Sequence, residues 1–103
     1  MNSYFTFNDR LRIDLPDLPR PWESFTRREQ EKILGKWEEI RGGIPDRISE
    51  IEEKIKEKQQ DLYNEENFEM SCLLNSEISE LASQINDLWI WFRTSEVVRP
   101  HAG

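Results

Sequence analysis

Acidic residues in the second half of the 103-residue chain have a spacing that suits metal-ion chemistry. Glu77 and Glu80 stand three positions apart, so a helix places both on one face, and Asp87 follows two turns later. Three more carboxylates precede them at similar spacing, namely Glu50, Glu53 and Glu57. Carboxylate oxygens are the ligands that Mg2+ prefers, and two neighbouring helices can present them to one ion. If these side chains converge, they support Mg2+-dependent hydrolysis.

The segment "EISE", residues 77–80, resembles the first of the paired E-x-x-E and E-x-x-D motifs of all-α nucleotide pyrophosphohydrolases. In the place of the second motif the chain reads "QIND", residues 84–87, so its leading carboxylate is missing. No basic residue stands nearby to hold a phosphate. The resemblance implies a Mg2+-dependent enzyme, whereas solvated helix faces explain the same carboxylates without chemistry. We therefore predict that the protein is not an enzyme and has no metal or cofactor, with the hydrolase as the alternative.

Other residue types that carry chemistry are scarce. His101 is the single histidine and Cys72 the single cysteine, and there is no Gly-rich loop or CxxC motif. One cysteine cannot form a disulfide within a chain, which predicts a reducing, cytoplasmic location. No apolar run approaches the roughly 20 residues that span a bilayer, so no membrane association is expected.

The charge of the chain is strongly segregated. The formal net charge is -7, and residues 44–80 hold eleven acidic and four basic residues, while the remainder is balanced. An acidic surface disfavours direct contact with nucleic acid or anionic lipid, but it speeds the encounter with a basic protein. The predicted acidic partner surface consists of Glu50, Glu53, Glu57 and Asp61. The alternative is that this charge serves solubility alone.

The elements that must position these groups are helices. A helical domain is expected over residues 23–95, with helices at about 26–41, 45–63 and 67–95. Thr26 and Glu29 form a capping box at the start of the first helix, and Pro45 is a favoured first residue of the second helix. Gly42 or Gly43 is expected to end the first helix in a left-handed C-cap.

Two apolar seams predict how the last two helices pack. The first consists of Ile44, Ile48, Ile51, Ile55 and Leu62, with Lys58 in its one gap. The second is out of phase with the first and consists of Leu74, Ile78, Leu81, Ile85, Leu88 and Phe92. The phase slip favours a turn and an antiparallel, coiled-coil-like hairpin, and one long helix over 45–95 is the alternative. The predicted fold is mostly α, with this hairpin and one shorter helix.

The two ends of the chain have different patterns. Residues 1–22 alternate apolar and polar side chains and then become proline-rich, which predicts an extended or β-hairpin arm. Residues 96–103 are expected to form a flexible tail.

The cluster of large apolar residues at 89–92 exceeds what one amphipathic face can bury. Successive helix positions point about 100° apart, so several sides of this segment need cover. Trp89 and Phe92 are expected in the core, whereas Ile90 and Trp91 fit a core or a subunit interface equally. The candidate interface residues are Trp89, Ile90, Trp91, Phe92, Trp37, Phe5 and Phe7. From this surplus we predict a small non-catalytic interaction protein that self-associates as a homo-oligomer, most simply a dimer. The alternative is an acidic adaptor or inhibitor of a basic, for example nucleic-acid-binding, protein.

Overall fold

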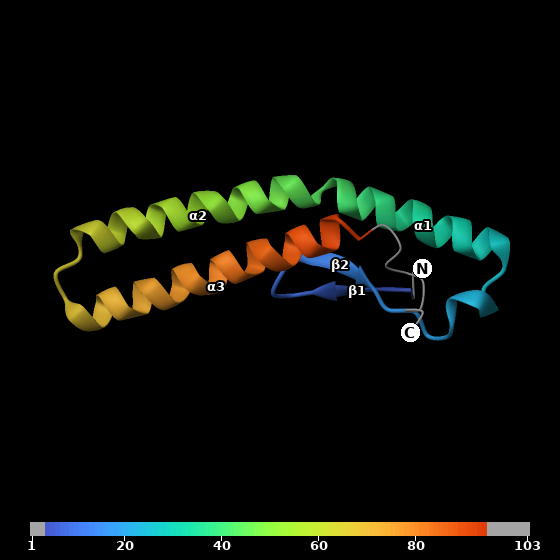
Figure 1. The fold of residues 1–103 in the computed structure, drawn as a ribbon, viewed down its shortest axis with the longest axis horizontal. Helices are drawn as coiled ribbons and strands as arrows, with labels where there is room; N and C mark the ends of the chain where they lie inside the picture. Colours follow the sequence, from blue (N-terminus) through green and yellow to red (C-terminus); the bar gives the residue numbers. More distant parts are fainter. Residues whose placement is uncertain (1–3, 95–103) are drawn as a thin grey trace.

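A computed structural model describes residues 4–94, and these residues form mostly helix with one small sheet (Figure 1). The elements in chain order are β1 (Phe5–Asn8), β2 (Ile13–Pro16), a 3-10 turn (Trp22–Ser24), α1 (Arg27–Gly42), α2 (Ile44–Asn64) and α3 (Phe68–Phe92). The predicted fold class is confirmed, because α2 and α3 form an antiparallel hairpin and β1 pairs with β2 in an N-terminal β-hairpin. The predicted tail, residues 96–103, lies outside the described residues.

The β-hairpin uses its turn to reach the helices. β1 and β2 are antiparallel, with Phe5 opposite Pro16 and Asn8 opposite Ile13. Between them the turn buries Leu11, and Arg12 adopts the left-handed backbone with φ 63°. The Asn8 side chain accepts a hydrogen bond from the Leu11 N–H at 2.8 Å, which helps to hold this tight turn. The turn between the strands therefore contributes a buried residue to the core.

α1 and α2 form one long bent helix rather than two separated helices (Figure 1). The predicted capping box is present, since Thr26 accepts from the Glu29 N–H and Glu29 accepts from the Thr26 N–H. The predicted left-handed C-cap is wrong, because Gly43 has φ -89° and ψ -6°. Pro45 has no N–H to donate to the preceding turn, which interrupts the hydrogen-bond ladder and bends the helix there.

The connection between α2 and α3 is short and polar, and it excludes one uninterrupted helix over 45–95. α2 ends at Asn64 with Glu65 as its C-cap, and the Asn67 side chain caps α3 by accepting from the Met70 N–H at 2.9 Å. Asparagine is among the best N-cap residues, so the turn needs neither glycine nor proline. α3 ends at Phe92 instead of 95, because the Thr94 N–H turns back to the Trp91 carbonyl.

The core lies at the base of the hairpin, where α2, α3 and the β-hairpin turn meet. Its buried residues are Leu11, Ile44, Ile48, Ile51 and Leu88. A second, smaller cluster joins Phe25 and Ile33 to the N-terminal arm. The two apolar seams face each other as predicted, with Leu74 and Leu88 buried on α3. Prediction fails at Trp89, which is 38% exposed although the sequence placed it in the core.

Candidate interaction surface

The three carboxylates of α3 that were proposed as metal ligands are bound by cations of the same chain. Arg10, in the β-hairpin turn, contacts Glu80 and Asp87 at 2.7 Å each and donates to the Ser83 hydroxyl at 2.8 Å. Glu77 accepts from Lys58 of α2 at 2.8 Å. Among residues 4–94, no three His, Cys, Asp or Glu side chains are grouped so that they could hold a metal ion. The geometry thus assigns these carboxylates to holding the fold together.

The pKa shifts follow from these contacts. The hydrogen bonds that Arg10 donates to Asp87 and then to Glu80 raise the pKa of Arg10. The pKa of Glu80 is lowered, first by the hydrogen bond from Gln84 and next by that from Arg10. The hydrogen bond that Lys58 donates to Glu77 raises the pKa of Lys58. All three shifts favour the charged forms of these groups, as expected for side chains that form ion pairs within the chain.

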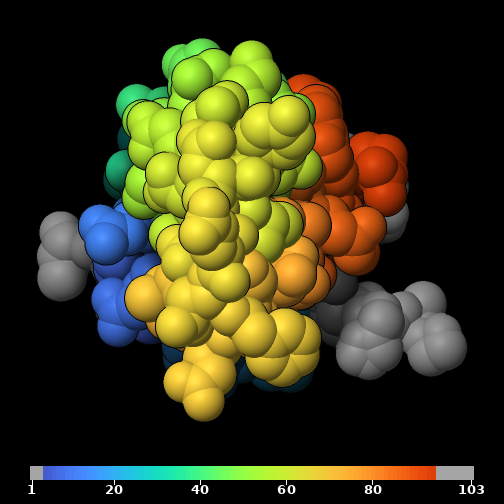
Figure 2. All heavy atoms as spheres, turned by 90° about the vertical axis from the view of Figure 1, so that its left-hand side faces the viewer, coloured from blue at the N-terminus to red at the C-terminus, as the bar shows by residue number. Residues whose placement is uncertain are grey.

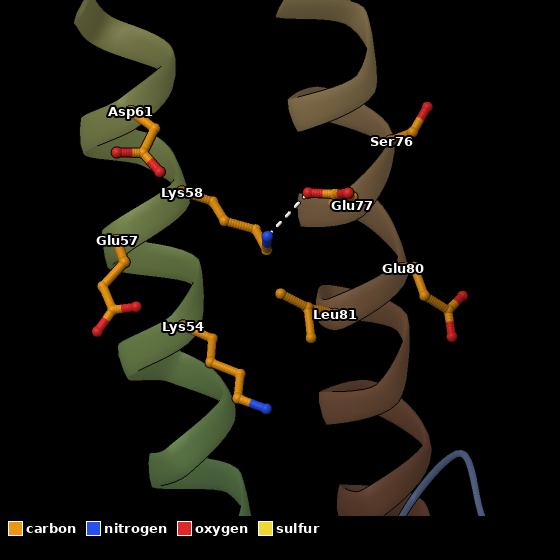
Figure 3. A pocket seen from close by; sticks show the side chains of 8 residues that line it. All are labelled: Lys54, Glu57, Lys58, Asp61, Ser76, Glu77, Glu80 and Leu81. Carbon is orange, nitrogen blue, oxygen red and sulfur yellow. Dashed lines mark hydrogen bonds and ion pairs between the residues drawn. The ribbon is translucent and has the colours of Figure 1, made fainter. Parts of the chain in front are cut away.

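An open groove of about 620 Å3 runs between α2 and α3 (Figure 3). It is lined by Lys54, Glu57, Lys58, Asp61, Ser76, Glu77, Glu80 and Leu81. Figure 3 shows Lys58 and Leu81 pointing between the helices, while Glu80 and Ser76 point away. Both signs of charge line the groove, and its central ion pair is satisfied, so it offers no selective site for an anion or a cation.

The predicted acidic partner surface is less free than its composition indicates. Glu50 pairs with Arg47 at 3.0 Å, and Glu53 pairs with Lys56 at 3.5 Å. Glu57 and Asp61 alternate with Lys54 and Lys58 along the groove. The four residues lie on α2 as expected, but basic side chains of the same helix separate or neutralise them.

The aromatic residues at the end of α3 divide between the inside and the outside of the molecule. Trp37 is 1% exposed, which leaves it no surface for a second chain and removes it from the interface candidates. Trp91 packs edge-on against Trp37 with ring centroids 5.8 Å apart, and Phe92 lies under the Arg41 guanidinium at 5.6 Å. The side chains of Trp91 and Phe92 are both half-buried. α1 therefore covers much of the surface that the sequence left unassigned.

The other four interface candidates differ in how far their side chains are exposed. Trp89 and Ile90 are exposed by 38% and 48%, and Phe7 is also exposed. Phe5 is half-buried and packs against the Phe25 cluster. The free part of the predicted interface is thus narrower than the sequence indicated, and it centres on Trp89 and Ile90.

α3 has three faces, and within the described residues 4–94 other segments cover two of them. One face carries the apolar seam against α2, and a second binds Arg10 through Glu80, Ser83 and Asp87. The third face, called the open face here, has exposed residues at three- and four-residue spacing: Cys72, Asn75, Ser79, Ala82, Asn86, Trp89 and Ile90. It contains no charged residue, in a chain that is 34% charged. A search for this spacing among small uncharged residues would have found it in the sequence.

The end of the hairpin around the α2–α3 turn, called the tip here, exposes aromatic side chains that sequence reasoning missed. Tyr63 and Phe68 are 86% and 79% exposed, and Leu73 is half-exposed. Figure 2 looks onto this end, and the yellow residues of the turn stand in front with nothing over them. Acidic residues surround them, namely Asp61, Glu65, Glu66 and Glu69.

The fold and its surfaces define an elongated helical-hairpin protein with an uncharged open helix face and an aromatic, acidic tip. No protein-family model, no curated protein and no solved structure matches the chain. Within residues 4–94 no helix combines the length and the apolar character needed to cross a membrane.

Proposed function

We propose that this is a small non-catalytic interaction protein of the cytoplasm that self-associates as a two-fold homodimer through the open face of α3. The observation that carries the proposal is the exposure of Trp89 and Ile90 at the end of a helix face without charge. Large apolar side chains grouped on an exposed surface are typical of contact sites. The absence of charge matters equally, because it lets the face meet a second copy of itself without repulsion.

Two-fold symmetry matches the layout of this face. In an antiparallel pair of α3 helices that cross at Ala82, Trp89 of each copy lies beside Asn75 of the other, because 82 is midway between them. Small side chains at Ser79 and Ala82 let helix axes approach to about 8 Å. Trp89 of each copy then packs over the small polar side chains at the Asn75 end of the other copy's open face. Both ends of the contact are therefore filled.

Other surfaces support self-association less well. The outward side of α2 carries Glu52, Glu53 and Glu57 among lysines, so a second copy placed there would have to bury charged side chains, which costs free energy unless each one is paired. The intrachain ion pairs of Glu77, Glu80 and Asp87 support the non-catalytic part of the proposal, because a Mg2+ ion would have to displace Lys58 and Arg10. The single cysteine supports the cytoplasmic assignment.

The test is the mass of the protein in solution with one charge placed at the centre of the open face. Ala82→Glu brings two carboxylates together at the two-fold axis, so sedimentation equilibrium at low micromolar concentration should give a dimer for the wild type and a monomer for the variant. Gln59→Glu is the matched control, since it makes the same charge change at an exposed position of α2. A monomeric wild type, or an Ala82→Glu protein that remains dimeric, contradicts the proposal.

A further inference from the structure

The tip exposes large apolar side chains that the fold does not use. Tyr63 and Phe68 are almost fully exposed, and about half of the surface of Met70 and of Leu73 is exposed as well. Backbone hydrogen bonds and the Asn67 side chain hold the turn, so these four side chains are not needed for it. Apolar side chains that are grouped on a surface without a role in the fold are typical of contact sites.

The carboxylates beside these rings lack the cations that neutralise the rest of α3. Every other carboxylate of α3 is bound by an arginine or lysine of the same chain. Glu66 and Glu69 are exposed and form no salt bridge within residues 4–94. Residues 59–92 contain no lysine or arginine, so the sequence supplies no cation next to them. The tip therefore combines exposed rings with unpaired charge of one sign.

Another place in the chain shows what a ring and a carboxylate bind together. The Arg20 guanidinium lies 4.1 Å from the centre of the Phe25 ring and 3.3 Å from a carboxylate oxygen of Glu29. The face of the ring attracts the guanidinium, and the carboxylate accepts from its N–H groups. The tip has rings and carboxylates of the same kinds without an arginine. A partner that supplies arginine completes the same arrangement.

A second copy of this chain is a poor source of that arginine. α1 carries five basic side chains, more than any other element, but four acidic ones stand among them. α2 has four basic and six acidic residues. Either helix of a second copy thus brings carboxylates towards the tip together with its cations, and contact between two tips brings together carboxylates alone.

The charge of the tip also disfavours partners that are rich in phosphate. Nucleic acid and anionic lipid both present negative charge, which a surface with only carboxylates repels. A protein surface is the remaining class that displays arginine beside apolar side chains. Its encounter with the tip is accelerated by the opposite charges.

We propose that the tip is a docking surface for a different protein, which presents an arginine-bearing apolar segment to Tyr63 and Phe68. Arginine side chains of that segment stack on the two rings and pair with Glu66 and Glu69, while its apolar side chains contact Leu73. Tyrosine and arginine are among the residue types that most often dominate the binding energy of a protein interface. This surface goes beyond the open-face dimer and uses none of its residues.

The test is the binding of a defined probe, measured by fluorescence anisotropy. The probe is a fluorescein-labelled helical peptide of arginine and leucine, in which arginines border a stripe of leucines. Two matched peptides replace every leucine with serine or every arginine with glutamate. We expect the Arg/Leu peptide to bind, the Arg/Ser peptide to bind at least about tenfold more weakly, and the Glu/Leu peptide not to bind. Binding should weaken as salt rises, because the charges lie at the surface.

Two variants of the tip separate the rings from the carboxylates. Tyr63→Ser with Phe68→Ser should weaken binding of the Arg/Leu peptide at least about tenfold, and Glu66→Gln with Glu69→Gln should weaken it about fivefold. All four side chains are exposed, so thermal melting should be nearly the same as for the wild type. A loss of binding then cannot come from a loss of folding.

Matched controls make the same chemical changes away from the tip. Phe7→Ser removes an exposed ring from β1, and Glu52→Gln with Glu53→Gln removes two exposed charges from α2. Both should change binding by less than about twofold, as expected for surface positions outside a contact. All measurements are made in the Ala82→Glu protein, so the result does not depend on the open-face dimer.

Three results overturn the proposal. One is the absence of binding of the Arg/Leu peptide at protein concentrations up to about 1 mM. A second is an equal loss in the tip and control variants, because net charge alone would then attract the peptide. The third is binding of single-stranded RNA or of phosphatidylserine vesicles that is lost in the tip variants, since this assigns the tip to a phosphate-rich partner.

Discussion

At the scale of single residues, Arg10 joins the N-terminal arm to the helical hairpin. Its guanidinium donates to Glu80, Ser83 and Asp87, which lie 70, 73 and 77 positions away in the sequence, and the neighbouring Leu11 enters the core. Planar guanidinium groups suit such multiple contacts better than ammonium groups do. The carboxylates that suggested metal binding in the sequence thus have a positioning role for the β-hairpin.

The Arg10 contacts predict a pH dependence of stability. The pKa of Glu80 is lowered in the folded protein, so its contribution is fully present above the unfolded pKa of about 4.3 and is lost as the pH falls through the lower folded pKa. Thermal melting of the wild type and of Arg10→Gln should therefore differ near pH 7. The difference should shrink from about pH 5 downwards. A difference that stays constant to pH 3 would count against the role given to Glu80.

Trp37 and Trp89 should respond differently to the same substitution. Trp37 is buried, and its indole N–H donates to the Thr94 carbonyl at 3.1 Å, so Trp37→Phe leaves a cavity and an unpaired carbonyl. We predict a loss of about 1–3 kcal/mol in the free energy of unfolding by urea. Trp89→Phe is the control in dilute, monomeric protein, with a loss below about 0.5 kcal/mol. Equal losses would contradict the burial assigned to the two side chains.

At the scale of elements, the junction of α1 and α2 decides the length of the molecule. A left-handed cap at Gly43 would have turned the chain sharply, whereas its right-handed backbone lets α2 continue after a bend. The Arg47 N–H bonds to the Gly43 carbonyl at 3.2 Å and restarts the helical ladder beyond Pro45. This bent helix therefore carries α1 away from the tip (Figure 1).

The conformation of Gly43 has a direct test. Because its φ is negative and a Cβ atom would lie 3.6 Å from the Ile40 carbonyl oxygen, alanine fits without strain. Gly43→Ala should raise the free energy of unfolding by about 0.4–1 kcal/mol, since alanine loses less backbone entropy on folding. The measurement is chemical denaturation of both proteins. Destabilisation by 1 kcal/mol or so would instead indicate a left-handed residue at this position.

At the scale of the whole molecule, the core is small and lies at one end of the hairpin. The principal extents are 59, 25 and 24 Å, and the main buried cluster gathers where the β-hairpin turn meets α2 and α3. In the described segment 52–80, Leu74 is the one buried side chain. Stability is therefore expected to fall from the base of the hairpin towards its tip.

Hydrogen exchange measures this gradient. Backbone amides in 44–51 and 81–88, beside the main cluster, should be the most protected, and those in 58–73 should exchange at least about tenfold faster through local opening. Measurement in the Ala82→Glu protein removes protection that comes from a second copy. Uniform protection along α2 and α3 would mean that the hairpin opens only as a unit.

The sequence by itself determined the three helices, the capping box that starts α1 and the pairing of α2 with α3, but not the conformation of the α1 C-cap at Gly43. These features depend on near neighbours: Thr26 and Glu29 cap within one turn, and the two seams repeat every three or four residues. The phase slip between the seams also marked the hairpin turn correctly. Local periodicity predicts which helix faces pair, because a helix buries the residues that lie along one of its faces.

Only the tertiary structure decided which faces of the helices remain open. Trp89, Trp91 and Phe92 are alike in the sequence, yet α1 covers two of them and leaves Trp89 exposed, because the bend at Gly43 sets where α1 lies. Likewise, Glu80 and Asp87 resembled metal ligands until the β-hairpin turn brought Arg10 to them. Contacts between distant segments depend on how whole elements are placed, and no spacing within one helix records that placement.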